Sequence, residues 1–499
     1  MHIVIPMAGV GQRFIDAGWS EPKPLIHVDG KAIVEHACDM FPSEKKFTFI
    51  CNEKHLNETN MREELISIRP SAKIVKIPNH TKGPVFSVLA IADSLDDDEE
   101  LIINYCDFGI YWDYSDFLKH TRQRDADAAL ICYNKFHPHM FSGTNYAVVS
   151  DKEQWMEEIK EKEPIDKAMR KYVSNGTFYF KRAGDFKKYA QLLIEKNITY
   201  NDEYYVSLIY NLLQSDGLRT SIYNIQHMLQ WGVPEEVNVY NMWSEYFKKL
   251  SLPSGTHSTI FTDVNIIPIL DETLTFEEVG YTSYEKIKLL EDVSGKEMLI
   301  QAVNSLPLSE KKIFLLSEQY MEDKRLVQTI EETLDNMNLI PVVHSIDDSF
   351  QALFKQKNFI EEDTSFIMGI NDGMILYDEE NLFKLKECNE VIIFTKNNLS
   401  CGIVYFKNKT VLDELQTLLS MHDLLSLLEY QTSMKITTFE VDAFISWKTP
   451  FLYESYKYWQ SFFHKVEWHP YTLEKDIYVN KEKIIELNHQ YRTFEQAYR

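Results

Sequence analysis

The sequence predicts an α/β protein in which a Rossmann-like mixed, mostly parallel sheet is present twice. Three observations predict this fold: apolar strands alternate with helical segments over the first 250 residues, a glycine loop follows the first strand, and the second half repeats landmarks of the first. Strands and helices that alternate at these lengths favour a parallel sheet covered on both faces. In such sheets, ligands bind beyond the carboxyl ends of the strands.

The elements follow one another from the first strand, which begins at His2 and continues through the apolar run Ile3 to Pro6. Further strands are predicted over 47–51, 73–77, 101–104 and 128–133, and helices over 32–40, 85–92, 116–121 and 202–213. The glycine loop at 8–13, the turn at 82–84 and Asp107 each follow a strand. We therefore expect all three at the same edge of the sheet, around one ligand.

The glycine loop has the composition of a phosphate site. Gly9 and Gly11 permit positive φ and close approach of a ligand to the main chain. Arg13 and Lys23, which lies between Pro22 and Pro24, add positive charge for a polyphosphate. The spacing fits neither G-x-G-x-x-G nor the Walker loop, so we predict neither a dinucleotide fingerprint nor a P-loop.

Ala8-Gly9-Val10-Gly11-Gln12-Arg13 together with Pro22-Lys23-Pro24-Leu25 resembles the signature of the sugar-phosphate nucleotidyltransferases, the nucleotide-sugar pyrophosphorylases. The resemblance covers about the first 245 residues. It implies a GT-A-like nucleotidyltransferase fold, one nucleoside triphosphate (NTP) site and a Mg²⁺-dependent reaction with a phosphorylated small molecule.

The resemblance also implies roles for particular residues. Arg13 is expected at the β- and γ-phosphates, Lys23 at the α-phosphate, and Asp107 on Mg²⁺, and these three form the predicted catalytic set. The predicted nucleotide-binding residues are Ala8, Gly9, Gly11, Lys82 and Gly83, with Gly83 against the base. The predicted acceptor-binding residues are Tyr146, Lys162, Asn175 and Gly176.

Each assignment has a purely structural alternative. Arg13 and Lys23 also fit solvated turn residues, Asp107 a helix cap, and Gly83 a plain turn. Lys162 lies in a charged segment that equally fits a solvated face. His137 and His139 flank a proline without a third metal ligand at suitable spacing, so we favour a structural or acceptor-shaping role for them.

One position departs from the family pattern. Many members carry a second metal-binding Asp where this chain has Gln230. An amide oxygen can bind Mg²⁺ but adds no negative charge, so the second metal ligand and the usual acceptor are both open. Glu235 and Glu236 follow closely in sequence, but the sequence does not indicate that they reach the site.

The second half repeats the first with its phosphate residues replaced. At a shift of 262, Pro6 matches Pro268 and Phe14 matches Phe276, and after a three-residue slip Gly30-Lys31 matches Gly295-Lys296. Further matches join 106–113 to 371–378 and 231–243 to 447–459, with roughly 49 residues lost from the acceptor-holding region of the second copy. The same shift aligns Gly9, Gly11, Arg13 and Lys23 with Asp271, Thr273, Thr275 and Glu285. We therefore predict a catalytic domain over 1–250, a degenerate copy over 260–463 for packing, oligomer formation or regulation, and a polar C-terminal tail over 464–499.

Composition narrows the class of protein. A net charge of -24 disfavours nucleic-acid binding, which needs clustered Lys and Arg. The six cysteines form no C-x-x-C pair and are expected to be reduced. No signal-like leader precedes the first strand and no apolar run could span a bilayer, so a cytoplasmic protein without membrane association is expected.

These patterns predict an enzyme that couples an NTP to a phosphorylated small molecule, most simply a sugar 1-phosphate, for capsule or surface-polysaccharide synthesis. The pathway is implied by the resemblance alone. The alternatives are a cytidylyltransferase with a non-sugar phosphate acceptor and a regulatory or scaffold protein of the same fold. A GT-A glycosyltransferase would need an Asp-x-Asp metal motif, which Asp107-Phe108-Gly109 does not supply.

Overall fold

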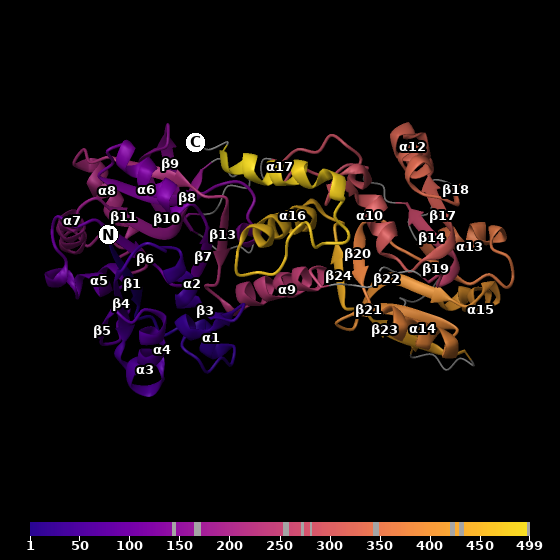
Figure 1. Cartoon of the computed structure of the whole chain (residues 1–499), viewed down its shortest axis with the longest axis horizontal. Coiled ribbons are helices and arrows are strands. Elements are labelled where there is room, and N and C mark those ends of the chain that lie inside the picture. Colours follow the sequence, from indigo (N-terminus) through magenta and orange to yellow (C-terminus); the bar gives the residue numbers. More distant parts are fainter. Residues whose placement is uncertain are drawn as a thin grey trace. The chain divides into compact units, whose positions relative to one another are not determined.

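The computed structural model describes residues 1–141, 146–163, 171–252, 259–270, 274–279, 282–342, 349–419, 425–428 and 434–496. The chain divides into two compact units (Figure 1). Unit 1 contains Met1–Lys249, Tyr458–Thr472 and His489–Arg499. Unit 2 contains Leu250–Lys457 and Leu473–Asn488.

Unit 1 is built on a nine-stranded sheet of order β5-β4-β1-β6-β11-β8-β12-β10-β9. Its strands are β1 His2–Met7, β4 Lys46–Asn52, β5 Lys73–Ile77, β6 Leu101–Asn104, β8 Ala128–Tyr133, β9 Tyr146–Lys152, β10 Trp155–Glu163, β11 Tyr172–Phe180 and β12 Thr220–Asn224. Strands β5, β4, β1 and β6 run parallel, as do β8 and β12, whereas β9, β10 and β11 run antiparallel to their neighbours. The sheet is therefore mixed, and β10 and β11 run against the direction of the other seven strands.

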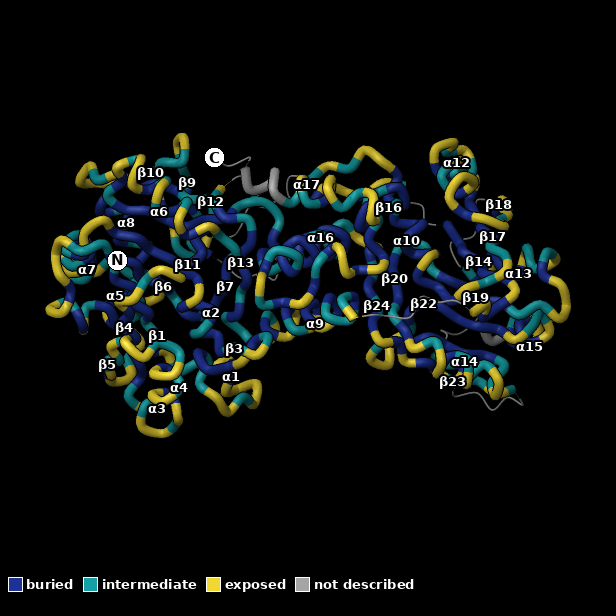
Figure 2. The backbone as a smooth tube through the Cα atoms, viewed as in Figure 1, coloured by how far each residue is buried: buried dark blue, intermediate teal, exposed yellow. Residues whose placement is uncertain are grey.

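Apolar residues fill both faces of this sheet. Ile3 and Ile5 of β1 belong to one hydrophobic cluster and Val4 to the other, because successive residues of a strand point to opposite faces. The helices of this part of the chain are α1 Gln12–Asp16, α2 Ile33–Asp39, α3 Glu53–Glu58, α4 Met61–Ile68, α5 Pro84–Leu89, α6 Tyr114–Gln123, α7 Ala183–Glu195, α8 Ser207–Ser215 and α9 Pro234–Leu250, with 3₁₀ turns η1 Lys23–Leu25, η2 Ala92–Ser94 and η3 Pro138–Phe141. Figure 2 shows the strands largely buried, with exposed residues gathered in loops and on outer helix faces. The unit is thus a three-layer α/β structure.

The predicted helix over 202–213 begins later than expected. Residues 200–203 form a turn closed by a bridge between Tyr200 and Glu203, and Asn201 and Asp202 have φ of 49° and 62°. A helix cannot pass through residues in the left-handed region, so α8 starts at Ser207.

Two small sheets complete unit 1. Strands β2 His27–Val28 and β3 Lys31–Ala32 form a hairpin, and β7 Phe108–Tyr111 pairs antiparallel with β13 His227–Gln230. The second pairing sets Gln230 opposite Phe108, and the Trp231 N–H donates to the Asp107 carbonyl at 2.9 Å. This pairing brings Asp107 and the segment after Gln230 together although 123 positions separate them (230 − 107).

Unit 2 is built on a seven-stranded sheet of order β18-β17-β14-β19-β22-β21-β23. The strands are β14 Thr262–Ile269, β17 Ser309–Ser317, β18 Met337–Val342, β19 Phe366–Met368, β21 Val391–Lys396, β22 Leu399–Phe406 and β23 Ile436–Glu440. Their order and directions repeat those of β5-β4-β1-β6-β11-β8-β12. Two small sheets also recur, as β15 Asp292–Val293 with β16 Lys296–Glu297 and β20 Gly373–Leu376 with β24 Ala443–Ser446.

The remaining helices lie in the second half of the chain. They are α10 Met298–Ser305, α11 Glu318–Glu322, α12 Lys324–Thr333, α13 Ser349–Gln356, α14 Glu379–Cys388, α15 Lys409–Leu419, α16 Pro450–Lys465 and α17 Ile484–Gln496, with 3₁₀ turns η4 Lys288–Leu290, η5 Lys357–Phe359, η6 Leu425–Leu428 and η7 Lys481–Lys483.

The alignment of Lys23 with Glu285 is wrong. Lys288 begins the 3₁₀ turn η4 as Lys23 begins η1, and the residues before them, Ile287 and Pro22, share φ of -55° and ψ of 135°. The three-residue slip therefore precedes this turn. Asp271 and Thr273, the other proposed matches, lie outside the described residues, whereas Thr275 and the exposed Glu285 lie within them.

The acceptor-holding region differs most between the units. In unit 1 the chain from β8 to β11 includes β9 and β10, whereas in unit 2 the corresponding strands β21 and β22 are joined through Asn397 and Asn398 alone. Both asparagines have positive φ, 51° and 62°, as a tight hairpin turn requires. A large part of the predicted loss from the second copy falls at this turn.

The residues from 464 onward do not form a separate tail. They are divided between the two units, and His469, Tyr471, Leu473 and Tyr478 are buried. Such side chains pack into cores instead of extending into solvent.

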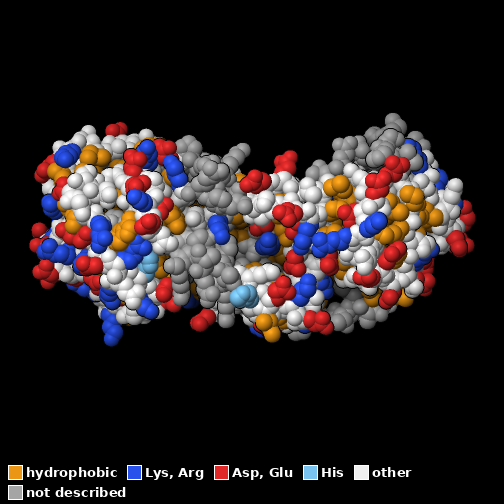
Figure 3. All heavy atoms as spheres, turned by 90° about the horizontal axis from the view of Figure 1, so that it is seen from above, with side chains coloured by type: hydrophobic (Ala, Val, Ile, Leu, Met, Phe, Trp, Pro, Cys, Tyr) orange, Lys and Arg blue, Asp and Glu red, His pale blue; other side chains and the backbone are white. Residues whose placement is uncertain are grey.

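The surface agrees with the acidic composition. On the face drawn in Figure 3, acidic and basic side chains are interspersed among the described residues. Within the described part of the chain, no helix combines the length and apolarity needed to cross a bilayer.

Candidate active site

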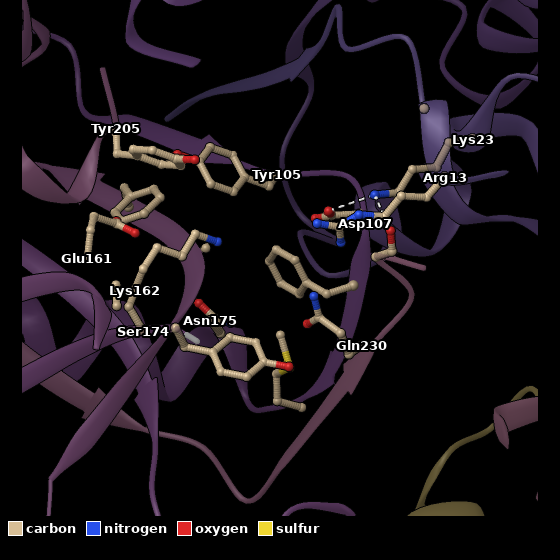
Figure 4. A pocket seen from close by; sticks show the side chains of 18 of the residues that line it. Arg13, Lys23, Tyr105, Asp107, Glu161, Lys162, Ser174, Asn175, Tyr205 and Gln230 are labelled. Atoms are coloured by element: carbon tan, nitrogen blue, oxygen red, sulfur yellow. Dashed lines mark hydrogen bonds and ion pairs between the residues drawn. The ribbon is translucent and has the colours of Figure 1, made fainter. Parts of the chain in front are cut away.

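A cavity of about 440 Å³ lies in unit 1 at the carboxyl end of β1 and beside β7 and β13. It is bordered by the glycine loop, the Lys23 turn, the start of β7, the bulged parts of β10 and β11, and the end of β13 (Figure 4). A second cavity of about 320 Å³ adjoins it and shares Gly11, Lys23 and Asp107 with it. Most of the predicted site residues therefore lie around one pair of connected hollows.

The glycine loop connects β1 to α1. Gly11 has φ of 72° and precedes the first residue of α1, and a Cβ placed on it would lie 3.3 Å from the Cβ of Lys23. This conformation favours glycine. Gly9 lacks the positive φ expected for it, but no atom lies within 4 Å of where its Cβ would be. Ala8 and Gly9 line the smaller cavity, and the exposed Arg13 on α1 lines the larger one.

Lys23 and Asp107 form an ion pair between the two cavities. The Lys23 ammonium donates to Asp107 Oδ2 at 2.8 Å and to the Gly232 carbonyl at 3.2 Å (Figure 4). Desolvation opposes ionisation of Asp107, but the charge and hydrogen bond of Lys23 outweigh it and hold the pKa of Asp107 below its usual value. Asp107 is therefore an anion at neutral pH, with a side chain still 32% exposed.

The turn after β13 supports this pair. Glu236, on the first turn of α9, accepts from the Gly232 and Val233 N–H groups through Oε2, at 2.9 and 3.1 Å. Burial, together with the nearby Asp107 charge, raises the pKa of Glu236 to about 7, although its backbone hydrogen bonds oppose the rise. The sequence indicated no role for Glu236. A glutamate two residues after a helix-starting proline is a capping pattern that could have identified it.

Two β-bulges form the opposite wall. The pairing of β10 with β9 shifts register between Lys160 and Glu163, and Lys162 has φ of 55°. Both Glu161 and Lys162 consequently line the cavity, whereas adjacent residues of a regular strand would point to opposite faces. Burial raises the pKa of Glu161, which accepts from the Ser207 hydroxyl.

The second bulge lies in β11, between Ser174 and Phe178. Gly176 there has φ of 98°, and a Cβ on it would lie 3.0 Å from the Phe108 ring. Ser174 Oγ and Asn175 Nδ2 are buried and have no hydrogen-bond partner among the described residues. Tyr146 lines the same wall. All four predicted acceptor-binding residues therefore border the larger cavity.

The turn before α5 borders the smaller cavity. Gly83 has φ of 86°, and a Cβ on it would lie 2.8 Å from both the backbone nitrogen and the carbonyl oxygen of Tyr204. Lys82 lines neither cavity, and its ammonium lies 4.6 Å from the centre of the Phe86 ring. Gly83 thus fits the predicted nucleotide wall and the Lys82 side chain does not.

His137 and His139 lie outside the cavities in an aromatic cluster. The His137 ring is 4.5 Å from Tyr133 and 5.2 Å from Tyr458, and burial lowers the pKa of His137 to about 3. His139 Nε2 lies 3.0 Å from the Tyr133 hydroxyl. Over the described residues, no group of three or more His, Cys, Asp or Glu side chains is placed to hold a metal ion.

Asp107 and Gln230 fit a Mg²⁺ ion that is also held by substrate phosphates. Gln230 Oε1 is buried and finds no hydrogen-bond partner within the described ranges. Carboxylate and amide oxygens are hard donors, and protein-bound Mg²⁺ commonly takes one or two of them together with phosphate oxygens and water. The donor set therefore suits the ion that the resemblance implies.

Comparison with known proteins agrees with this geometry. Residues 3–208 match the family model described as Nucleotidyl transferase. Among curated proteins, none matches the chain.

Three solved structures that resemble the chain each align with about half of its residues. A nucleoside-diphosphate-sugar pyrophosphorylase from Vibrio cholerae RC9 is 22% identical, with a TM-score of 0.41, over 48% of this chain and 99% of its own. An inositol-1-phosphate CTP transferase from T. maritima is 14% identical, with a TM-score of 0.38, over 48% and 92%. A UTP-bound UGPase from Acinetobacter baumannii is 15% identical, with a TM-score of 0.39, over 51% and 94%.

The family match spans the glycine loop, the Lys23–Asp107 pair and both bulged strands, and it agrees with the resemblance found in the first thirty residues. Over residues 3–208, the chain is similar to the nucleotidyl transferase family.

Proposed function

We propose that unit 1 is a Mg²⁺-dependent nucleotidyltransferase that couples an NTP to a phosphorylated small molecule, most simply a sugar 1-phosphate, and releases pyrophosphate. The observation that carries this proposal is the position of the cations. Arg13 and the Lys23–Asp107 pair lie on one side of the 440 Å³ cavity, and Lys162 lies on the other (Figure 4). Two phosphorylated substrates can therefore meet between them.

In the proposed reaction, an ionised phosphate oxygen of the acceptor attacks the α-phosphorus of the NTP. The new bond joins that oxygen to the α-phosphorus, and the bond to the β-phosphate bridging oxygen breaks, so pyrophosphate leaves with the electron pair. No proton has to move, because the nucleophile is already an anion. The protein has only to position and neutralise the reactants.

The residues of unit 1 divide this work between them. The backbone amides around Gly9 and Gly11 and the Arg13 guanidinium receive the β- and γ-phosphates. Gly83, which packs closely against the Tyr204 backbone, lies beside the base. Lys23 neutralises charge that develops at the α-phosphate. Mg²⁺, when bound at Asp107 and Gln230, supplies further neutralisation of the phosphates.

Lys162 holds the acceptor phosphate, and Ser174 and Asn175 offer hydrogen bonds to acceptor hydroxyls. A cytidylyltransferase with a non-sugar acceptor is the second candidate. Six aromatic side chains line the larger cavity, namely Phe14, Tyr105, Phe108, Tyr146, Phe178 and Tyr205, which also suits a less hydroxylated acceptor.

We infer that unit 2 is a copy of the same fold without this chemistry. Its sheet repeats the strand order of unit 1, but residues 397–398 stand where unit 1 has β9 and β10. The equivalent of Lys162, which lies on β10, is therefore missing from its described residues. We place the reaction in the cytoplasm, where thiols stay reduced, because all six cysteines are free. A role in supplying surface-polysaccharide synthesis rests on the family resemblance.

The first experiment is pyrophosphate release by the full chain with each of the four common NTPs and Mg²⁺. The acceptor panel contains sugar 1-phosphates, phospho-amino acids and phospho-amines. Release with one NTP and one acceptor is expected and identifies both substrates, and a non-sugar acceptor would favour the second candidate. Absence of NTP binding would contradict the proposal and favour a regulatory or scaffold protein.

A further inference from the structure

The two units end their small β-sheets with the same turn. In unit 1, the Trp231 N–H donates to the Asp107 carbonyl at 2.9 Å, and in unit 2 the Trp447 N–H donates to the Asp372 carbonyl at 2.6 Å. Each turn leads into a helix that begins with proline, α9 at Pro234 and α16 at Pro450. The turn is therefore a requirement of the fold and does not depend on the proposed chemistry.

Two positions in this turn differ between the units. Gly232 and Glu236 of unit 1 correspond to Lys448 and Leu452 of unit 2, counting from the tryptophans. In unit 2 the Leu452 N–H donates to the Thr449 hydroxyl at 3.3 Å, so a side-chain oxygen still caps the helix. A carboxylate is thus not needed to begin a helix at this place.

In unit 1 the carboxylate instead fixes one peptide group. Glu236 Oε2 accepts from the Gly232 N–H at 2.9 Å, and the Gly232 carbonyl accepts from the Lys23 ammonium at 3.2 Å. A Cβ on Gly232 would lie 3.0 Å from Gln230 Nε2 and 3.3 Å from Glu236 Oε2. The absence of a side chain at 232 therefore lets Glu236 reach the backbone that holds Lys23.

We propose that Glu236 is a positioning residue, which orients the Lys23 ammonium through the Gly232 peptide. The inference rests on the nucleotidyltransferase function proposed above. Lys23 has two acceptors in this arrangement, Asp107 Oδ2 and the Gly232 carbonyl, and two acceptors define the direction of an ammonium better than one. Glu236 itself does not contact the reacting atoms.

The test uses the full chain and transfers the cap of unit 2 to unit 1. In the double variant Val233→Thr, Glu236→Leu, a hydroxyl can cap α9 as Thr449 caps α16, but the carboxylate is absent. We expect a thermal midpoint close to that of the wild type, kcat at least tenfold lower, and KM for the NTP changed by less than threefold. Unchanged kcat in this folded variant would overturn the proposal.

Two single variants decide the matter if the double variant does not fold. Glu236→Gln keeps an oxygen that can accept both N–H groups, so its kcat should stay within threefold of the wild type, whereas Glu236→Ala should lose tenfold or more. Equal kcat in these two variants would contradict the proposal.

A cap on another helix of unit 1 provides the control. Asp113 accepts from the Asp116 N–H at 2.9 Å at the start of α6. Asp113→Ala should lower the thermal midpoint with little change in kcat. If Asp113→Ala reduced kcat as much as Glu236→Ala, the effect would be general loss of stability and the proposal would fail. Pyrophosphate release by the wild type, measured in parallel, tests the proposed function separately.

Discussion

Lys23 begins the 3₁₀ turn η1 of unit 1, and Lys288 begins the corresponding turn η4 of unit 2. The sheets of the two units share the same strand order. Each lysine forms an ion pair with an aspartate 84 positions later, at 2.8 Å to Asp107 and 3.3 Å to Asp372. The side chains of the first pair are 18% and 32% exposed, and those of the second are 5% and 16% exposed. The ion pair is therefore common to both units. In unit 1 both of its residues line the two cavities, whereas the cavity of about 400 Å³ beside η4 in unit 2 is lined by Ile287 and Leu290 and not by the ion pair.

This difference separates two roles that one lysine can have. The mostly buried ion pair of unit 2 connects η4 to the start of β20, so part of the contribution of Lys23 in unit 1 is also structural. The rest of the contribution of Lys23 depends on its surroundings, namely the glycine loop, Arg13 and the bulged strand that carries Lys162. Matched substitutions in the two units can separate these parts.

The largest effect is expected from the two lysines. Lys23→Ala should reduce turnover by about 10²–10³-fold, because one preorganised charge at the reacting phosphate is lost. Lys288→Ala should leave turnover within threefold of the wild type and lower the stability of unit 2 by about 3 kcal/mol, because the mostly buried Asp372 carboxylate loses the Lys288 ammonium. Steady-state kinetics and thermal unfolding measure both.

Similar losses of turnover in both lysine variants would break the distinction between the units. In that case, unit 2 would contribute to the reaction or to the folding of unit 1.

A smaller effect is expected from two glycines with positive φ. Gly83→Ala should raise KM for the NTP about 10- to 100-fold, since its Cβ would meet the Tyr204 backbone at 2.8 Å beside the nucleotide cavity. Gly402 in unit 2 has φ of 76° and an open surrounding, with the nearest atom to an added Cβ, Ile370 Cγ2, at 3.4 Å. Gly402→Ala should cost about 1–2 kcal/mol of stability from backbone strain, with KM unchanged. An unchanged KM for Gly83→Ala would remove Gly83 from the nucleotide site.

The smallest effect is expected on the loss of stability at low pH. Burial lowers the pKa of His137 from about 6.5 to about 3, so its favourable contribution is complete above pH 6.5 and is lost as pH falls below that value. His137→Phe should therefore reduce the loss of stability between pH 7 and pH 5 by about 2 kcal/mol.

Tryptophan fluorescence can assign this loss to unit 1, because Trp447 is the one tryptophan in the sequence of unit 2. Denaturant unfolding of His137→Phe in a Trp447→Phe background measures the pH dependence. The same slope with and without His137 would show that acid acts elsewhere.

The sequence predicted the fold well where local patterns determine structure. The predicted bounds of β5, β6 and β8 agree with the observed ones, and the apolar residues of β6 and β8 are buried, as expected for strands covered on both faces. The glycine loop, the turn at 82–84 and Asp107 were expected together from the general rule that parallel strands end at one edge of a sheet.

The remaining features depend on contacts between distant segments. Lys288 was missed because a three-residue insertion before η4 moved it out of the alignment that placed Glu285 there. The bulge that turns Lys162 into the cavity depends on pairing with β9, which a charged strand does not reveal. The apolar residues between His464 and Asn488 were too sparse to indicate a core, yet Tyr471 and Tyr478 are buried.

Unit 1 is formed by three separate segments of the chain, and this affects its folding during synthesis. The Tyr458 hydroxyl bonds both backbone groups of Met228, accepting from its N–H at 3.2 Å and donating to its carbonyl at 2.8 Å, and Met228 lines the larger cavity. A ribosome that has finished residues 1–249 must still synthesise 250–457 before Tyr458 emerges, which takes about 10–40 s at 5–20 residues per second. Nascent and prematurely terminated chains therefore lack part of the cavity's support. Activity should appear only once nearly the whole chain has been translated.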